Sequence, residues 1–233
     1  MKNILYSIAL TGIALLLFPH ADAQLEADLV KKVKAKLDKV NDYQVDGKMK
    51  IDVPFIKAPE SKVLIFFKKP DKLKVRKEGG ISILPKGGVS INLNSIIMTD
   101  NYTVIAAGET IVDGVKLKIV KLLPLVDTGN VVLTTMYIDE KNSVIRKSTI
   151  TTKESGTYEM QMTYGKYIDW GLPDKVVFSF NIKDYKLPKG VTFEYDSGAQ
   201  PSKEDAIKNK KGKVEITYAN YVINKGIRDE VFK

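Results

Sequence analysis

The alternation of hydrophobic and polar positions divides the chain into one helical stretch followed by many short strands. From Leu25 to Val40, apolar residues recur at every third or fourth position, and lysines fill most of the other positions. This spacing predicts an amphipathic helix whose apolar stripe, formed by Leu25, Leu29, Val33, Leu37 and Val40, covers another hydrophobic surface.

After the helix the period changes to two, which is typical of strands with one buried face. Tyr43 to Val53 alternates in this way. Further strands are predicted at 63–67, 73–76, 102–107, 110–123, 131–138, 144–152, 157–167, 176–182 and 214–223. The stretch 110–123 contains Asp113-Gly114, which indicates a tight hairpin because both turn positions favour positive φ.

Two stretches interrupt this series. Gly79 to Met98 is broken by glycine and proline into short apolar pieces, and Asp196 to Lys213 is polar and lysine-rich, as an exposed loop would be. No internal repeat or linker divides the chain. Many short strands after one helix therefore predict a mainly β (α+β) fold, with a curved antiparallel sheet that is closed or nearly closed.

The start of the chain predicts export. Lys2 precedes an apolar run from Ile4 to Phe18, and Ala21-Asp22-Ala23 has the small-x-small pattern that signal peptidase cleaves. We therefore expect residues 1–23 to be a signal peptide and residues 24–233 to form a single exported domain. No later segment approaches the roughly 20 apolar residues of a membrane span, so the mature protein is expected to be soluble.

The chain is basic, with a formal net charge of +9, and lysine supplies nearly all of the positive charge. Only Arg76, Arg146 and Arg228 are arginines. A lysine-rich surface is either simply solvated or attracted to anionic membranes and lipid phosphates. The scarcity of arginine and the expected export argue against a nucleic-acid partner.

The composition also narrows the possible chemistry. Cysteine is absent, and the single histidine, His20, lies in the predicted signal peptide. This excludes Ser-His-Asp and Cys-His catalysis and the common zinc sites from the mature chain. We expect no enzyme activity, no cofactor and no metal.

Two acidic sequences need separate interpretation. Asp127-Thr128-Gly129, after two apolar residues, has the form in which an aspartic peptidase presents one of its two carboxylates. A second copy is missing, so a turn between strands is the simpler interpretation, and a peptidase remains a remote alternative. Asp139-Glu140 is expected to lie in a solvated turn.

Several segments after the signal peptide and the helix occur in a familiar order. They are Tyr43–Gly47, Phe66–Val75, Tyr137–Lys147, Trp170–Phe180 and Tyr218–Phe232. In this order the chain resembles the periplasmic outer-membrane lipoprotein carriers, the LolA-like lipoprotein-sorting family. It departs from the family in having lysines where the early strand usually carries arginine, and 79–98 matches no family pattern.

The resemblance implies an incomplete β-barrel whose concave apolar face is covered by helices. It implies a monomeric periplasmic carrier or chaperone that holds the acyl chains of lipoproteins, or another lipid, and moves them toward the outer membrane. The implied partners are an inner-membrane donor and an outer-membrane acceptor protein. The same fold also serves envelope sensors that regulate a protein partner, and this is the alternative function.

Candidate ligand-binding residues follow from the apolar pattern together with the resemblance. The expected acyl cavity is lined by Leu29, Val33, Leu37, Met49, Ile51, Ile65, Phe67, Ile96, Ile97 and Met98. The alternative for each is an ordinary place in the core. Lys74, Arg76 and Lys77 form a basic stripe expected to contact an anionic headgroup or a membrane, with a solvated face as the alternative.

Overall fold

The computed structural model of the protein describes residues 18–53, 59–70, 72–77, 101–125, 130–154, 156–181 and 211–232. In these residues one α-helix, α2 (Phe18–Leu37), precedes ten strands. The strands are β1 (Asp42–Asp52), β2 (Ser61–Lys68), β3 (Lys72–Lys77), β4 (Tyr102–Val112), β5 (Val115–Pro124), β6 (Val131–Asp139), β7 (Val144–Thr152), β8 (Gly156–Thr163), β9 (Lys175–Asn181) and β10 (Lys211–Ile223). Two 3₁₀ helices complete the set, η1 (Ile168–Trp170) and η2 (Asp229–Phe232).

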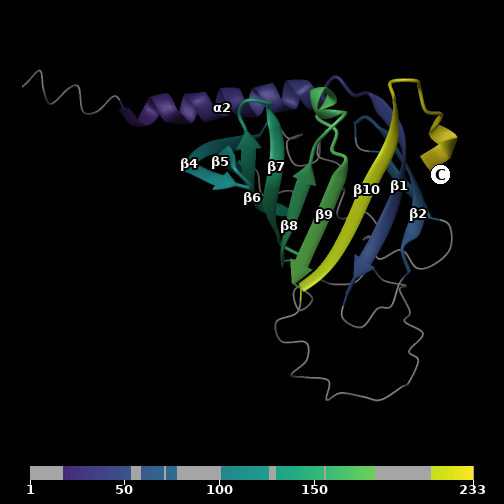
Figure 1. Ribbon diagram of the computed structural model, residues 1–233. Coiled ribbons are helices and arrows are strands. Elements are labelled where there is room, and N and C mark those ends of the chain that lie inside the picture. Colours follow the sequence, from purple (N-terminus) through teal and green to yellow (C-terminus); the bar gives the residue numbers. More distant parts are fainter. Residues whose placement is uncertain are drawn as a thin grey trace, which may run out of the picture.

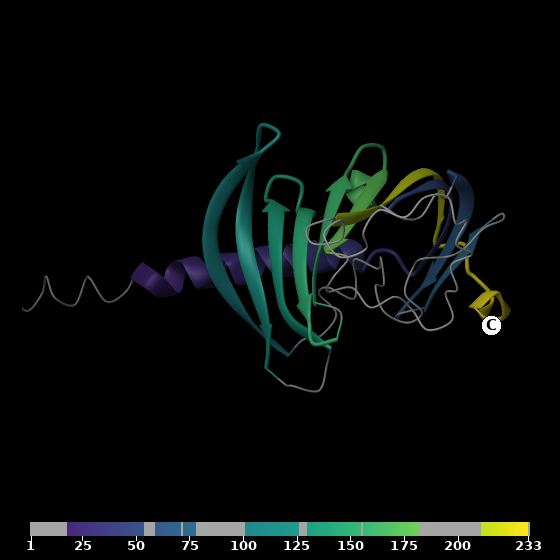
Figure 2. The same cartoon turned by 90° about the horizontal axis from the view of Figure 1, so that it is seen from below.

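All ten strands form one antiparallel sheet in the order β3-β2-β1-β10-β9-β8-β7-β6-β5-β4. The sheet curves strongly from the teal strands at one side to the blue strands at the other (Figure 2). Among the described residues its end strands, β3 and β4, do not pair with each other, so the barrel is incomplete. This confirms the predicted fold class.

The two faces of the sheet differ in burial. Along β1, Val45, Met49 and Ile51 are buried while the intervening Lys48 and Lys50 are exposed. The pairing of β1 with β2 and β10 continues the same buried face across neighbouring strands. We call this concave, apolar side the inner face. Helix α2 lies across one end of the strands (Figure 1) and its buried residues belong to the same hydrophobic cluster.

The helix differs from its predicted bounds at both ends. It begins at Phe18 rather than Leu25, because Ala21 to Ala27 contains good helix formers and no breaker. It ends at Leu37, where the amide of Val40 turns back to the Leu37 carbonyl at 3.1 Å. Leu25 was expected in the buried stripe but is 51% exposed. No described helix is long and apolar enough to cross a membrane.

Most predicted strands are confirmed, with two informative differences. Residues 102–112 form one strand, since Gly108 (φ 89°) makes a bulge and does not end it. The Asp113-Gly114 hairpin is confirmed, with φ of 49° and 76°. Strand β8 ends at Thr163 rather than Tyr167, and the Tyr164 hydroxyl donates to the Ile145 carbonyl at 2.9 Å.

Candidate functional site

The inner face gathers every described residue that was predicted to line an acyl cavity. Leu29, Val33 and Leu37 come from α2, and the others, from the first two strands, are Met49, Ile51, Ile65 and Phe67. All seven belong to one buried hydrophobic cluster, and none is more than 6% exposed. Ile96, Ile97 and Met98 lie outside the described residues.

The wall of the inner face formed by β8, β9 and β10 consists of residues that were not predicted as lining. Its members are Tyr158, Met160, Met162, Val176, Phe178, Phe180, Val214, Ile216 and Tyr218. Register pairs Met160 with Phe178, and Phe178 with Val214, so their side chains share one side of the sheet. The signal for these residues was present, because each of the three strands alternates apolar and polar positions.

Methionine and aromatic side chains are frequent in this hydrophobic cluster. The four methionines of the described residues, Met49, Met136, Met160 and Met162, are all buried in the cluster. Unbranched thioether side chains adapt to irregular apolar shapes, so they are suited to packing against a flexible hydrocarbon chain. Gly212 contributes by having no side chain, since a Cβ there would lie 2.5 Å from the Phe180 ring.

Aromatic rings also close one end of the inner face, below η1. The ring centroids of Tyr43 and Phe67 are 5.2 Å apart, and Tyr221 packs against Tyr43 at 5.3 Å and against Tyr167 at 4.8 Å. Such tilted and edge-on pairs stabilise beyond the area they bury. The Tyr221 hydroxyl donates to the Pro173 carbonyl at 2.8 Å, which satisfies its polar end inside the apolar surroundings.

The buried tyrosines leave this lining uncharged at neutral pH. Burial raises the pKa of Tyr158 to about 12 and moves the pKa of Tyr43, Tyr218 and Tyr221 above the usual value of 10. A phenol is neutral at pH 7 even with its usual pKa, and these raised pKa values keep it neutral in more alkaline solution as well. An apolar, uncharged concave surface is chemically suited to hydrocarbon.

The helix is closely packed on this surface. The gap between α2 and β7, lined by Val33, Leu37, Ile145 and Tyr164 among others, has no room for a water molecule. Gly171 (φ 67°) lies beneath the end of the helix, where its own missing side chain would be 3.1 Å from Leu37. A ligand at this point between the helix and the sheet would therefore require α2 to shift.

A group of charges lies where the first turns of α2 meet the hairpin of β4 and β5. Lys118 contacts Glu109 at 2.6 Å and Glu26 at 3.8 Å, and Lys116 also contacts Glu109 at 2.6 Å. The hydrogen bonds from Lys116 and Lys118 lower the pKa of Glu109. Glu26 is only 5% exposed, and its Oε2 atom has no hydrogen-bond partner.

Asp139 corrects the expectation of a solvated turn. It is 2% exposed at the end of β6, and its carboxylate accepts hydrogen bonds from Arg146 at 2.9 and 3.2 Å and from Asn142. Burial raises the pKa of Asp139, but the hydrogen bonds from Asn142 and Arg146 outweigh it and hold the pKa below its usual value. Tyr137 pairs with Lys147 and Ile138 with Ile145, so a bulge leaves Arg146 as an extra residue on β7. This bulge places Arg146 within reach of Asp139, which alternation alone does not predict.

The predicted basic stripe on β3 is divided by the register. Arg76 pairs with Leu64 and Lys74 with Phe66, whereas Lys77 pairs with the inner-face residue Val63. Lys74 and Arg76 therefore share the outer face, because alternate residues of a strand point to the same side. The contact of Lys74, Arg76 and Lys77 with a headgroup or a membrane stays a prediction.

The outer face carries a hollow of about 710 Å³ over β1, β2 and β10. It is lined by Asp46, Gly47, Lys48, Lys62, Val63, Leu64, Arg76, Thr217, Tyr218 and Ala219. A second hollow of about 600 Å³ lies among the charged turns around Lys118 and Asp139. Among the described residues no group of three or more His, Cys, Asp or Glu side chains is arranged to hold a metal ion. Asp127 lies outside the described residues, between β5 and β6.

Comparison with known proteins identifies the fold. No protein-family model and no curated protein sequence matches the chain. Many solved structures match it, and three of them cover about nine tenths of its length. A DUF1329 family protein from Desulfovibrio piger is 13% identical, with a TM-score of 0.56, covering 91% of this chain and 97% of its own.

The other two matches name the fold directly. A LolA superfamily protein from Nitrosomonas europaea is 10% identical with a TM-score of 0.51, covering 91% of this chain and 97% of its own. A candidate outer membrane lipoprotein-sorting protein domain from Vibrio parahaemolyticus is 10% identical with a TM-score of 0.50, and the match covers 88% of this chain and 94% of that domain. The chain has the LolA-like fold. At these identities the likeness concerns the fold and not the ligand.

Proposed function

We propose that this protein is a periplasmic carrier that binds the acyl chains of lipoproteins, or of another lipid, on the inner face of its open sheet. The observation that carries the proposal is the apolar lining that continues across the neighbouring strands β2, β1, β10, β9 and β8. It contains several methionine and aromatic residues and is uncharged at neutral pH. A carrier role agrees with the lipoprotein sorting for which one structural neighbour is described. Export, cleavage after Ala23 and the donor and acceptor membrane proteins belong to the same proposal.

The energetics suit such a ligand. Each methylene moved from water into an apolar site contributes about 0.8 kcal/mol, so one long acyl chain is enough for tight capture. Part of this gain offsets the displacement of α2, whose apolar stripe packs on the inner face. The methionines Met49, Met136 and Met160 are expected to repack around the chain.

Native mass spectrometry of protein purified from its own periplasm, followed by organic extraction, tests the proposal. The expected result is a co-purifying acylated molecule bound to a polypeptide with the mass of residues 24–233. After delipidation the protein is expected to take up a fluorescent fatty-acyl probe. A bare polypeptide that takes up no probe would contradict the carrier and favour a module that binds and regulates a protein partner.

Polar substitutions on the inner face are expected to weaken uptake of the probe. Phe67→Asn and Ile65→Thr place a polar group where the acyl chain would lie, and each is expected to raise the Kd about tenfold or more, because a buried polar group without a partner is costly. Titration of the probe by fluorescence measures the effect. Ile65→Thr is the milder change and keeps the test valid if Phe67→Asn does not fold.

Leu64→Asn provides the matched control. Leu64 lies between Val63 and Ile65 on the same strand but faces outward. Its substitution is expected to leave the Kd for the probe within about twofold, since the residue does not contact the inner face. Equal weakening by Leu64→Asn and Ile65→Thr would place the probe elsewhere.

A further inference from the structure

The outer hollow over β1, β2 and β10 has a basic rim. Lys48, Lys62 and Arg76 line it, against the single carboxylate of Asp46. We call these three cations and the surface between them the basic groove. Its floor includes the apolar side chain of Leu64, and Gly47 lies at the bulge of β1.

The register concentrates positive charge at this point at a cost to stability. Lys48 lies directly opposite Lys62 on the neighbouring strand. Like charges in directly opposed positions repel, and an arrangement of opposite charges would be more stable. Among the described residues, one ion pair involves either of these lysines. Lys48 lies 3.7 Å from Glu60, and both side chains are more than half exposed. Exposed pairs of this length neutralise little.

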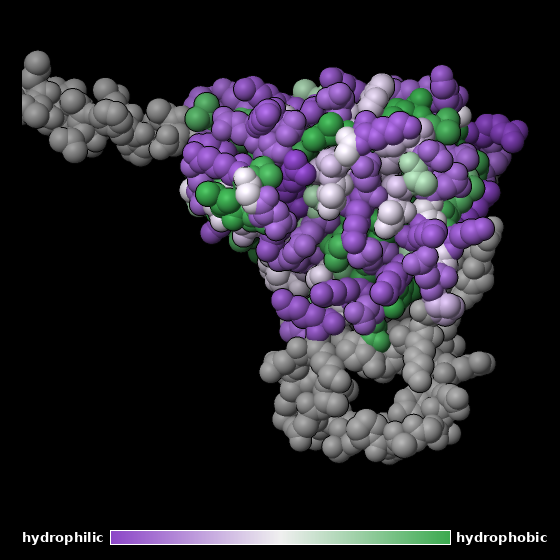
Figure 3. Space-filling model, viewed as in Figure 1, coloured by the Kyte–Doolittle hydropathy of each residue, from purple (hydrophilic) through white to green (hydrophobic). Residues whose placement is uncertain are grey.

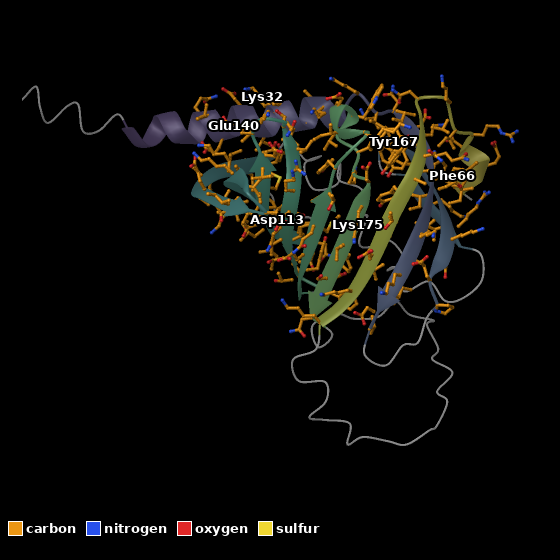
Figure 4. All side chains as sticks on the ribbon, viewed as in Figure 1. Lys32, Phe66, Asp113, Glu140, Tyr167 and Lys175 are labelled. Carbon is orange, nitrogen blue, oxygen red and sulfur yellow. The ribbon has the colours of Figure 1, made fainter. Side chains whose placement is uncertain are left out.

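Arg76 is held in place beside the two lysines. Its guanidinium lies 5.0 Å from the centre of the Phe66 ring, and Nη2 donates to the Val231 carbonyl at 3.4 Å. Figure 4 shows Phe66 on β2, close to the C-terminal helix η2. A guanidinium stacked on an aromatic ring keeps its remaining donors available in a fixed direction.

Elsewhere on the outer face some lysines lie close to a carboxylate. Over β7 to β10 this face is mostly hydrophilic (Figure 3), and two of its lysines pair across strands, Lys147 with Glu159 at 2.6 Å and Lys175 with Glu215 at 2.8 Å. At these two positions a glutamate of the neighbouring strand lies within 2.8 Å, whereas Lys48 lies opposite Lys62.

We propose that the basic groove docks the protein onto bilayers that contain anionic lipid. Lysines close to an arginine suit a surface that carries many phosphates. A lysine ammonium attracts phosphate as a point charge and does not require one fixed orientation of the phosphate. Lys74 lies on the same face as Arg76 and extends the contact along β3. The inference goes beyond the acyl-chain proposal and does not depend on it, since Lys48, Lys62 and Arg76 lie on the outer face and not among the inner-face residues.

Co-sedimentation with vesicles tests the docking. Protein purified from the periplasm is expected to bind vesicles of phosphatidylcholine with one third phosphatidylglycerol, and not vesicles of phosphatidylcholine alone. Each cation near such a surface contributes about fivefold in affinity, so the combined variant Lys48→Gln, Lys62→Gln and Arg76→Gln is expected to bind about a hundredfold more weakly. Glycerophosphate at the same phosphate concentration is expected not to compete, and competition would overturn docking to a bilayer surface.

The control removes the same charge elsewhere. The combined variant Lys121→Gln, Lys141→Gln and Lys166→Gln has an equal net charge and is expected to lose no more than about threefold, because these residues lie far from the groove in the sheet order. Equal losses in the two variants would overturn the proposal. Ile65→Thr is expected to bind vesicles as the wild type does, so failure of the acyl-chain proposal remains distinguishable from failure of this one.

Discussion

At the scale of single residues, the charges beside the first turns of α2 differ in how much they affect stability. Lys118 is the counter-charge of the buried Glu26 and also contacts Glu109, while Lys116 contacts only Glu109 and is 69% exposed in its side chain. Exposed ion pairs contribute little because water and salt screen them. A buried carboxylate that loses its counter-charge is costly, since its desolvation is no longer offset.

Lys118→Met is therefore expected to lower the free energy of unfolding by about 3 kcal/mol. Lys116→Met, two residues away on the same strand, is the control and is expected to cost less than about 1 kcal/mol. Urea denaturation followed by circular dichroism measures both. Equal and small effects would mean that Glu26 finds another partner in solution.

At the scale of elements, α2 packs against the sheet with one side only, and the leucines along it differ in burial. Leu29 is 5% exposed and packs in the central cluster, whereas Leu25, one turn earlier, is 51% exposed. The two leucines are chemically identical and occupy the same helix. Their difference measures what docking of the helix adds to its intrinsic tendency to form.

Leu29→Ala is expected to lower the free energy of unfolding by about 2–4 kcal/mol, because it leaves a cavity under the helix. Leu25→Ala is expected to change it by no more than about 0.5 kcal/mol. The midpoints of urea denaturation give the comparison. A large effect at Leu25 would mean that this turn of the helix is covered in solution.

At the scale of the whole molecule, acid weakens the fold through carboxylates that are bound in the native state. Burial and hydrogen bonds together leave the pKa of Asp139 below its usual value, and the hydrogen bonds from Lys68 and Lys72 lower the pKa of Asp229 to about 2. A group whose pKa is lower in the folded state binds fewer protons there than in the unfolded chain. Its stabilisation is present above the unfolded value of about 3.9 and is lost as the pH falls through the folded value.

The free energy of unfolding is accordingly expected to decline below about pH 4. Asp139→Asn is expected to be less stable at pH 7, where it lacks the ionic contact with Arg146, and to show a shallower decline between pH 4 and the onset of acid unfolding. Urea denaturation at a series of pH values tests both. A decline as steep as that of the wild type would mean that other carboxylates dominate.

The sequence by itself determined the elements and most of the faces, because both follow from local periodicity. The leading helix, the alternating strands and the Asp113-Gly114 turn each depend on a few neighbouring residues. The seven described residues that were predicted to line a cavity are all buried in one cluster. The overlooked wall at Met160 and Phe178 followed the same alternation, so it could have been predicted as well.

Only the tertiary structure decided features that depend on which strands become neighbours. The opposition of Lys48 and Lys62 and the burial of Asp139 beside Arg146 both arise from register and bulges. A bulge shifts the pairing by one residue and turns side chains to the other face, and no local pattern encodes it. The exposure of Leu25, next to the buried Glu26, likewise depends on how α2 is set against the folded strands.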